Sequence, residues 1–276
     1  MTAGPIQMHW WAGVPNFGDV LSALIVAHVS GRDVVHVKPA KAELFALGSL
    51  LQVARRTHKT PRADGVKPWI WGTGLLHSVS SDFVENVRIA LVRGPVTAAL
   101  LGIKPREFGD PGLLVTDLVQ DRPETTDRIG IVPHHSQLDD PQIAGLSATD
   151  PAVQVIDVRD DALTVCRQIA ACRHVVASSL HGLIVADAFG VPNSWMDPGR
   201  QSHLKYLDYA ASIGRPLTLP LEIADVPAHL ATLKDSDTIL YTDAIAQARQ
   251  ALIDSFPAEL CAQPDTTPAE LAGVTR

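Results

Sequence analysis

The sequence predicts an α/β protein with mainly parallel sheets, and three observations support this fold class. Short apolar or β-branched segments alternate with helical stretches along most of the 276 residues, which is typical of βαβ units. Turns rich in Gly, Ser, Asn and Asp follow several of these segments, where a strand would run into a helix. Hydrophobic residues make up 46% of the chain, which excludes a disordered or collagen-like protein.

The apolar runs predict the individual strands, and longer stretches with apolar residues at helical spacing predict the helices. Strands are expected at residues 7–12, 34–37, 68–71, 87–92, 107–108, 128–132, 153–158, 174–177 and 193–196. Helices are expected at residues 19–29, 42–56, 95–101, 160–171, 182–189, 204–212 and 242–255. The helix at 95–101 begins with Pro95, a residue favoured in a first helical turn.

A polar stretch at residues 120–127 separates two sets of these units and is the best candidate for a linker. We therefore expect an N-terminal Rossmann-like domain over 1–120 and a C-terminal one over 128–256. The segment 257–276, rich in Ala, Pro and Thr, is expected to be a flexible tail.

Charge and motif content exclude several functions. The formal net charge is −7 and no basic block is present, so a nucleic acid partner is not expected. No apolar run is long enough to cross a bilayer and the first residues lack a signal peptide pattern, so we expect a cytoplasmic protein. The three cysteines lack CxxC spacing, and HExxH, GxGxxG and Walker motifs are missing. No metal or cofactor is therefore expected.

Ligands of open parallel sheets bind at the carboxyl ends of the strands. In the first half, the expected strands lead into the turns 16–19, 72–74, 93–95 and 109–112. In the second half they lead into 132–135 and 178–182. Two such edges that face each other would form a cleft, and the polar residues of these turns are the candidates for its chemistry.

Asp19 stands at the start of an expected helix, where a carboxylate is favoured by unpaired N–H groups and by the helix dipole. A plain helix cap is the structural alternative. Asn16 and Gly18 favour a binding role, because a small residue lets a ligand approach the backbone. Gly74 is a weaker candidate, since glycine marks tight turns in any α/β protein.

Arg93 follows an apolar strand, and its planar guanidinium suits a phosphate or a carboxylate. It could instead pair with a structural carboxylate. Asp110, in Gly-Asp-Pro-Gly, is at least as well explained by the start of a turn as by chemistry.

His181 lies in a serine-rich turn, after Ser178 and Ser179, and would face the cleft. Its imidazole suits a proton donor or acceptor, and capping of the next helix is the alternative. His134 and His135 are neighbours at a strand end, so their side chains should point to opposite faces and at most one should reach the cleft.

Together these turns resemble the polysaccharide pyruvyl transferase family. The family carries an early Asn-x-Gly-Asp, a Gly-rich strand end, Arg-Gly-Pro, Gly-Asp-Pro and Ser-x-Leu-His-Gly. This chain matches the motifs, in the same order, at 16–19, 72–74, 93–95, 109–111 and 178–182. Each motif is short, but five in register are specific.

The resemblance implies two Rossmann-like domains in a GT-B-like arrangement. It also implies phosphoenolpyruvate as donor and a sugar, free or lipid-linked, as acceptor in the synthesis of a polysaccharide or glycolipid. The product would be a cyclic pyruvate ketal, and an acceptor on a lipid would allow peripheral membrane contact. By the match, His181 becomes the proposed general acid and Arg93 a ligand of the donor, and the two should face each other across the cleft. Asp19 is our candidate for the base.

One departure concerns the cation at the donor site. Many family members have Arg where this chain has Ser179, and Lys205 could supply the missing charge as a point charge without a two-pronged clamp. Two other functions stay open: a GT-B-type glycosyltransferase that uses a nucleotide sugar, and a non-catalytic glycan-binding protein.

Overall fold

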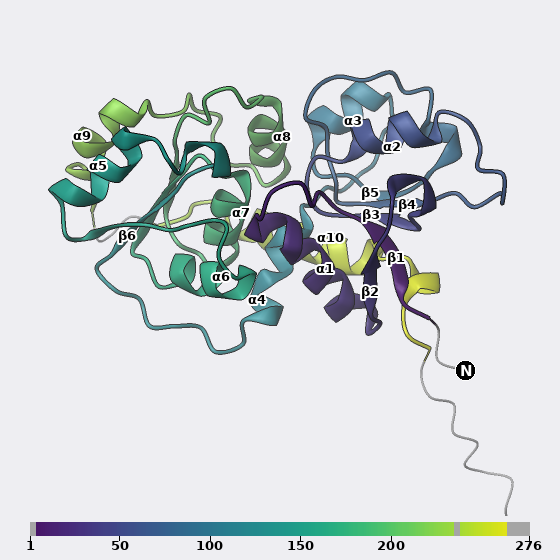
Figure 1. Ribbon diagram of the computed structural model, residues 1–276, viewed down its shortest axis with the longest axis horizontal. Coiled ribbons are helices and arrows are strands. Elements are labelled where there is room, and N and C mark those ends of the chain that lie inside the picture. Colours follow the sequence, from purple (N-terminus) through teal and green to yellow (C-terminus); the bar gives the residue numbers. More distant parts are fainter. Residues whose placement is uncertain (1–3, 235–237, 264–276) are drawn as a thin grey trace, which may run out of the picture.

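A computed structural model describes residues 4–234 and 238–263 and shows two lobes, each built on a parallel sheet (Figure 1). The five-stranded sheet has the order β2-β1-β3-β4-β5, and the four-stranded sheet has the order β7-β6-β8-β9. In chain order, the strands are β1 (Ile6–His9), β2 (Val34–His36), β3 (Leu44–Phe45), β4 (Trp69–Trp71), β5 (Arg88–Leu91), β6 (Ile129–Val132), β7 (Val153–Val155), β8 (His174–Ala177) and β9 (Asn193–Trp195). All their pairings are parallel, which confirms the predicted fold class.

Helices connect these strands and pack on the sheets. They are α1 (Phe17–Ser30), α2 (Leu51–His58), α3 (Pro95–Leu101), α4 (Val115–Leu118), α5 (Pro141–Thr149), α6 (Ala162–Ala170), α7 (Leu180–Ala188), α8 (Leu204–Ser212), α9 (Val226–Leu230) and α10 (Thr242–Ser255). Three of them, α3, α8 and α10, have the predicted bounds. Among the described residues, none of the helices has the length and apolar character needed to cross a bilayer.

The predicted helix at 42–56 is wrong in its first half. Leu44 and Phe45 form β3 between β1 and β4, and both are fully buried. Gly48 then takes a left-handed φ of 100°, which interrupts any helix, so α2 begins only at Leu51. Because β3 is a central strand buried on both faces, its sequence does not alternate between apolar and polar residues as a half-exposed strand would.

Three smaller differences concern other elements. The predicted strand at 107–108 does not form, and Gly109 N donates to Val92 O (3.3 Å) as the chain leaves the sheet edge. Helices α4, α5 and α9 were not predicted, although Asp140 caps α5 and Pro141 starts it. Helix α7 begins at Leu180, two residues before its predicted start, so His181 lies within its first turn.

The chain returns to the first lobe at its end. Helix α10 lies beside the five-stranded sheet (Figure 1), where Trp71 Nε1 donates to Leu252 O (3.0 Å). The first part of the predicted tail is packed there too, because Glu259 Oε1 accepts from Trp69 Nε1 and from Arg88 Nη1, both at 2.7 Å. Residues 264–276 of that tail lie outside the described residues. The domain limits at 120 and 128 stay a prediction.

Candidate active site

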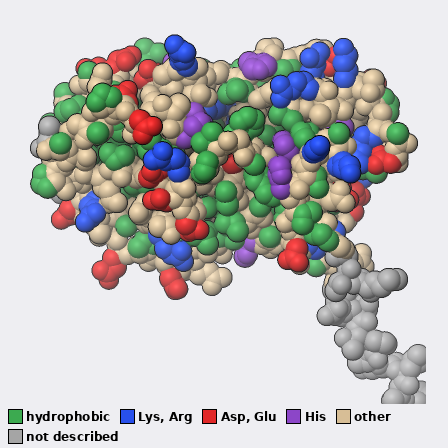
Figure 2. Space-filling view, viewed as in Figure 1, with side chains coloured by type: hydrophobic (Ala, Val, Ile, Leu, Met, Phe, Trp, Pro, Cys, Tyr) green, Lys and Arg blue, Asp and Glu red, His purple; other side chains and the backbone are tan. Residues whose placement is uncertain are grey.

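A cleft of about 480 Å³ lies between the lobes, at the carboxyl ends of both sheets. Figure 2 shows histidine side chains near the middle of one face, where the two lobes meet. Six residues predicted for the site line this cleft: Asn16, Asp19, His134, Ser179, His181 and Lys205. The first turns of α1, α2 and α7 also lie at the cleft, and helix N-termini favour an anion.

The turn that begins α1 brings the two lobes together. Asn16 Oδ1 accepts from Gly18 N (3.2 Å) and so caps the helix, while Phe17 N donates to Val158 O (2.8 Å) in the other lobe. A Cβ on Gly18 would lie 1.9 Å from His181 Nδ1. The glycine of Asn-x-Gly-Asp is therefore needed so that the His181 ring can lie directly against α1.

His181 is placed for chemistry rather than for capping. Ser179 is the cap of α7, because its Oγ accepts from Gly182 N (3.3 Å), so the capping alternative for His181 is wrong. The imidazole is only 9% exposed, yet it lines the cleft, and its Nε2 has no hydrogen-bond partner among the described residues. A buried polar atom without a partner points to a ligand or a solvent molecule.

Burial also sets the charge of His181. Burial in the lobe interface, followed by the positive charges of Lys205 and Arg93, lowers the pKa of His181 to about 3. The free protein therefore holds this imidazole in its neutral form near pH 7. A bound anion would act in the opposite direction and raise the pKa.

Asp19 and Lys205 come from different lobes and influence each other across the cleft. Burial raises the pKa of Asp19 to about 7, while the charge of Lys205 and a hydrogen bond with Asn16 act against this rise. Burial and the nearby Arg93 lower the pKa of Lys205 to about 8, and Asp19 opposes that change. Both groups thus titrate close to neutral pH, as expected of groups that exchange protons or bind anions.

Contrary to the prediction, the side chains of His134 and His135 do not point to opposite faces. Their ring centroids lie 4.1 Å apart, and both rings line the cleft. The alternation of a strand does not apply to them, because β6 ends at Val132 and the chain enters a 3-10 turn at His135. Burial lowers the pKa of His134 to about 3, with a further contribution from Lys205.

Ser178 has a structural part in this arrangement. Its Oγ accepts from His134 N (2.9 Å) and donates to Gln137 Oε1 (2.5 Å). It is fully buried and holds the two turns of the second lobe together.

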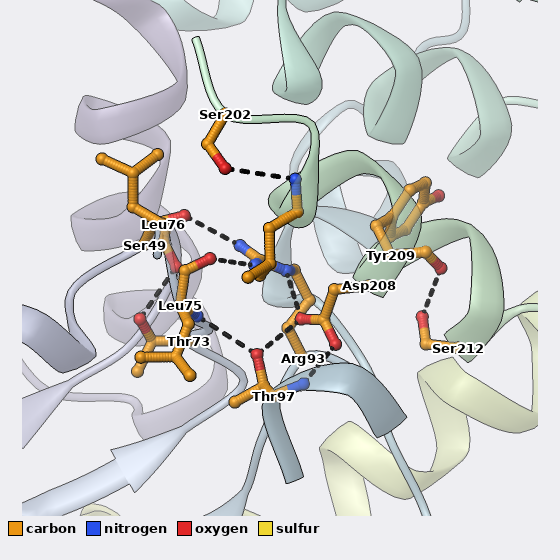
Figure 3. Close-up of polar contacts among 12 residues, drawn as sticks. Ser49, Thr73, Leu75, Leu76, Arg93, Thr97, Ser202, Asp208, Tyr209 and Ser212 are labelled. Atoms are coloured by element: carbon orange, nitrogen blue, oxygen red, sulfur yellow. Dashed lines mark hydrogen bonds and ion pairs between the residues drawn. The ribbon is translucent and has the colours of Figure 1, made fainter. Parts of the chain in front are cut away.

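Arg93 lies beneath the cleft and not on it. Its guanidinium is 0% exposed and donates to Asp208 Oδ2, Ser49 Oγ and Leu75 O, each at 3.0 Å (Figure 3). The structure therefore shows the alternative interpretation, a structural pair. The expectation that Arg93 and His181 face each other across the cleft is wrong, although Arg93 is near enough to lower the pKa of His181.

The Arg-Gly-Pro turn fastens α8 of the second lobe to the first. Asp208 accepts from Thr97 N (2.8 Å) and Thr97 Oγ1 (2.7 Å) besides Arg93. A Cβ on Gly94 would lie 2.1 Å from Asp208 O, so only glycine allows this approach. We call Arg93, Thr97 and Asp208 the interlobe clasp. Lys205 lies one helical turn before Asp208, so the clasp also fixes the helix that carries Lys205.

Gly74 and Asp110 contribute to the packing and capping of the fold. A Cβ on Gly74 would lie 2.3 Å from Arg93 Nη2, so this glycine makes room for the clasp. Asp110 Oδ1 accepts from Gly112 N (3.0 Å) and caps the 3-10 helix Pro111–Leu114, which is the turn-starting alternative. Burial raises the pKa of Asp110 to about 6, against the effect of Arg93.

Sequence reasoning missed several residues that line the cleft, including Trp11, Gln52, Arg56 and His77. Gln52 and Arg56 lie four residues apart on α2, so they share one face of that helix. The predicted helix at 42–56 already contained both residues, so their shared face was a signal that the sequence offered.

Comparisons with known proteins were consistent with the motifs. A family model described as polysaccharide pyruvyl transferase matches residues 16–199. The succinoglycan biosynthesis protein ExoV of Rhizobium meliloti is 34% identical over 191 residues, which cover 64% of this chain and 57% of that protein. The uncharacterized protein L143 of Acanthamoeba polyphaga mimivirus is 31% identical over 158 residues, which cover 52% of this chain and 54% of that protein.

The chain thus spans a little over half the length of these curated relatives. Among solved structures, a functionally uncharacterized protein of Klebsiella pneumoniae aligns with a TM-score of 0.46 at 12% identity, covering 76% of this chain and 88% of that one.

Proposed function

This chain belongs to the polysaccharide pyruvyl transferase family, and from that premise we propose that it forms a pyruvate ketal on a sugar. The donor is phosphoenolpyruvate, two hydroxyls of the sugar accept its enolpyruvyl unit, and inorganic phosphate is released. The observation that carries this proposal is the buried Nε2 of His181, which has no partner within residues 4–234 and 238–263, in a cleft that Lys205 also lines. Similarity to a succinoglycan biosynthesis protein supports an acceptor that belongs to a polysaccharide. The same reaction would serve an acceptor carried on a lipid.

Lys205 and the first turn of α7 form the proposed binding site for the anionic donor. Ser179 stands where many family members have Arg, and its Oγ is used as the helix cap. The backbone N–H groups that follow it lie at the N-terminus of a nine-residue helix, which attracts a phosphate or carboxylate. Lys205 adds a full positive charge from the side of α8, and this local charge overcomes the repulsion expected from a net charge of −7.

His181 is the proposed general acid. The phosphate and carboxylate of the donor raise the pKa of His181 from its low value, so donor binding and protonation of the imidazole support each other. The protonated ring then delivers its proton to the methylene carbon of the donor, which becomes a methyl group and leaves a cationic centre at the neighbouring carbon.

Two hydroxyl attacks complete the reaction. The first sugar hydroxyl bonds to the cationic carbon and loses its proton. The carbon–oxygen bond to phosphate then breaks, and the second hydroxyl bonds to the same carbon to close the ketal. One of the two hydroxyl protons restores the proton that His181 gave to the methyl group. The other leaves with phosphate. Asp19, whose pKa of about 7 keeps part of it ionised at neutral pH, is the proposed base.

A phosphate-release screen tests this proposal. Purified protein should release inorganic phosphate from phosphoenolpyruvate only when a suitable glycoside is present, tested with a panel of galactosides, glucosides and mannosides. Transfer from a nucleotide sugar, with phosphoenolpyruvate left intact, would identify a glycosyltransferase instead. Glycoside binding without any turnover would support a glycan-binding protein.

The kcat/KM for phosphoenolpyruvate should fall with rising pH above about 7. His181 is neutral in the free protein, so the donor must bind together with a proton, and below pH 7 this loss is offset by ionisation of Asp19. The fall should become steeper near pH 8, where Lys205 loses its charge. Lys205→Arg keeps the charge at higher pH and should move the alkaline limb upward. An alkaline limb that is the same in this variant would show that Lys205 is not the group responsible.

A further inference from the structure

We propose that Trp11 is the platform on which the ring of the acceptor sugar stacks, at the mouth of the cleft. This inference rests on the proposed function and assigns the acceptor end of the same site. It concerns a residue in the loop between β1 and the Asn-x-Gly-Asp turn.

Exposure divides the cleft into an inner and an outer end. His181 and Ser179, at the inner end, are 9% and 6% exposed, whereas Trp11 is 51% exposed although it lines the same cleft. Arg56 and His77, which also line it, are exposed. A small, highly charged donor suits the inner end, where desolvation strengthens its contacts, and a sugar that continues into a larger glycan needs the open end.

The Trp11 indole lies against the backbone of its own loop. A Cβ on Gly13 would lie 2.6 Å from Trp11 Cζ2, so a larger residue there would move the indole from this position. Trp10, next to Trp11, is half-buried and packs against the hydrophobic core, with its ring centroid 4.5 Å from that of His36. Of two adjacent tryptophans, one is therefore used for packing and the other is presented to the cleft.

The chemistry around Trp11 matches a pyranose ring. One face of such a ring carries C–H groups that pack on an aromatic surface, and its edge carries hydroxyls that need both donors and acceptors. His77 is exposed and its Nδ1 donates to Ser78 O (3.1 Å), so its Nε2 remains for a hydrogen bond with a hydroxyl. The guanidinium of Arg56 has no hydrogen bond or ion pair with other residues in the described part of the chain, so its N–H groups are available as donors.

Binding of methyl pyranosides to the chain of 276 residues tests the platform. The probes are methyl glycosides of galactose, glucose and mannose, measured by saturation-transfer NMR and titration calorimetry. Trp11→Leu keeps an apolar side chain but removes the flat ring, and should weaken binding of the best glycoside by about tenfold. Trp11→Tyr should restore most of it. Leu219→Ala, at a residue that is 88% exposed and does not line the cleft, is the matched control and should bind like the natural protein.

Kinetics separates this inference from the proposed function. In the phosphate-release assay, Trp11→Leu should raise the KM for the glycoside by a similar factor and leave the KM for phosphoenolpyruvate unchanged. If Trp11→Leu turns over with an unchanged KM for the glycoside, the stacking role of Trp11 is wrong and the proposed function stays intact. Glycoside binding that depends on Trp11 but comes without turnover would overturn the proposed function and leave the platform intact. If no pyranoside in the panel binds the natural protein, the platform is overturned.

Discussion

Replacing His181 with glutamine is expected to lower kcat by about 10²–10⁴-fold, because glutamine cannot deliver a proton to the methylene carbon of the donor. The fold should persist. Glutamine is polar and of similar size, and His181 Nε2 has no partner among the described residues that the substitution would leave unsatisfied. Phosphate release under saturating substrates measures the first effect, and the thermal unfolding midpoint measures the second.

His134→Gln is the matched control, since the two histidines line the same cleft and burial lowers the pKa of both to about 3. Its effect on kcat should be much smaller, because we assign it no proton transfer. Full activity in His181→Gln would refute the role of His181 as the acid. A large fall in its unfolding midpoint would assign His181 to packing instead.

Removing Asp208 is expected to give the largest loss of stability. In Asp208→Ala the guanidinium of Arg93 stays buried between the lobes without its carboxylate, and Thr97 loses two hydrogen bonds. Breaking a buried ion pair from one side lowers the free energy of unfolding by about 3–5 kcal/mol. Equilibrium unfolding in urea measures this loss.

Two further variants serve as controls for the unfolding experiment on Asp208→Ala. Asp82→Ala removes an exposed partner of Arg55 and should change the free energy of unfolding by less than about 1 kcal/mol. Arg93→Met combined with Asp208→Leu replaces the pair by apolar groups and should be more stable than Asp208→Ala alone. If Asp208→Ala unfolds like the natural protein, the clasp does not hold the lobes together.

The sequence predicted the parts of the fold that depend on local pattern. Helices α3, α8 and α10 have capping or periodic signals within their own residues, and their bounds were correct. The strand at 44–45 was missed because a fully buried strand looks like part of a helix when periodicity is the only signal.

The sequence predicted which residues lie at the candidate site better than it predicted what each of them does. The motifs brought Asn16, Asp19 and His181 to one cleft, since turns at the carboxyl ends of parallel strands converge. The partner of Arg93 is 115 residues away in sequence and in the other lobe, so no local pattern could show that its guanidinium is buried. For the same reason Trp11, which lies outside the motifs that carry the resemblance, gave no signal before the lobes were placed together.

The most direct test of the account is the mass and NMR spectrum of the product formed from phosphoenolpyruvate and a glycoside acceptor in D₂O. The acceptor should gain the mass of pyruvic acid less water, with one hydrogen of the new methyl group replaced by deuterium, because an acid in exchange with solvent protonates the methylene carbon. An acceptor that gains no pyruvyl group, or a ketal whose methyl group carries no deuterium, would contradict it.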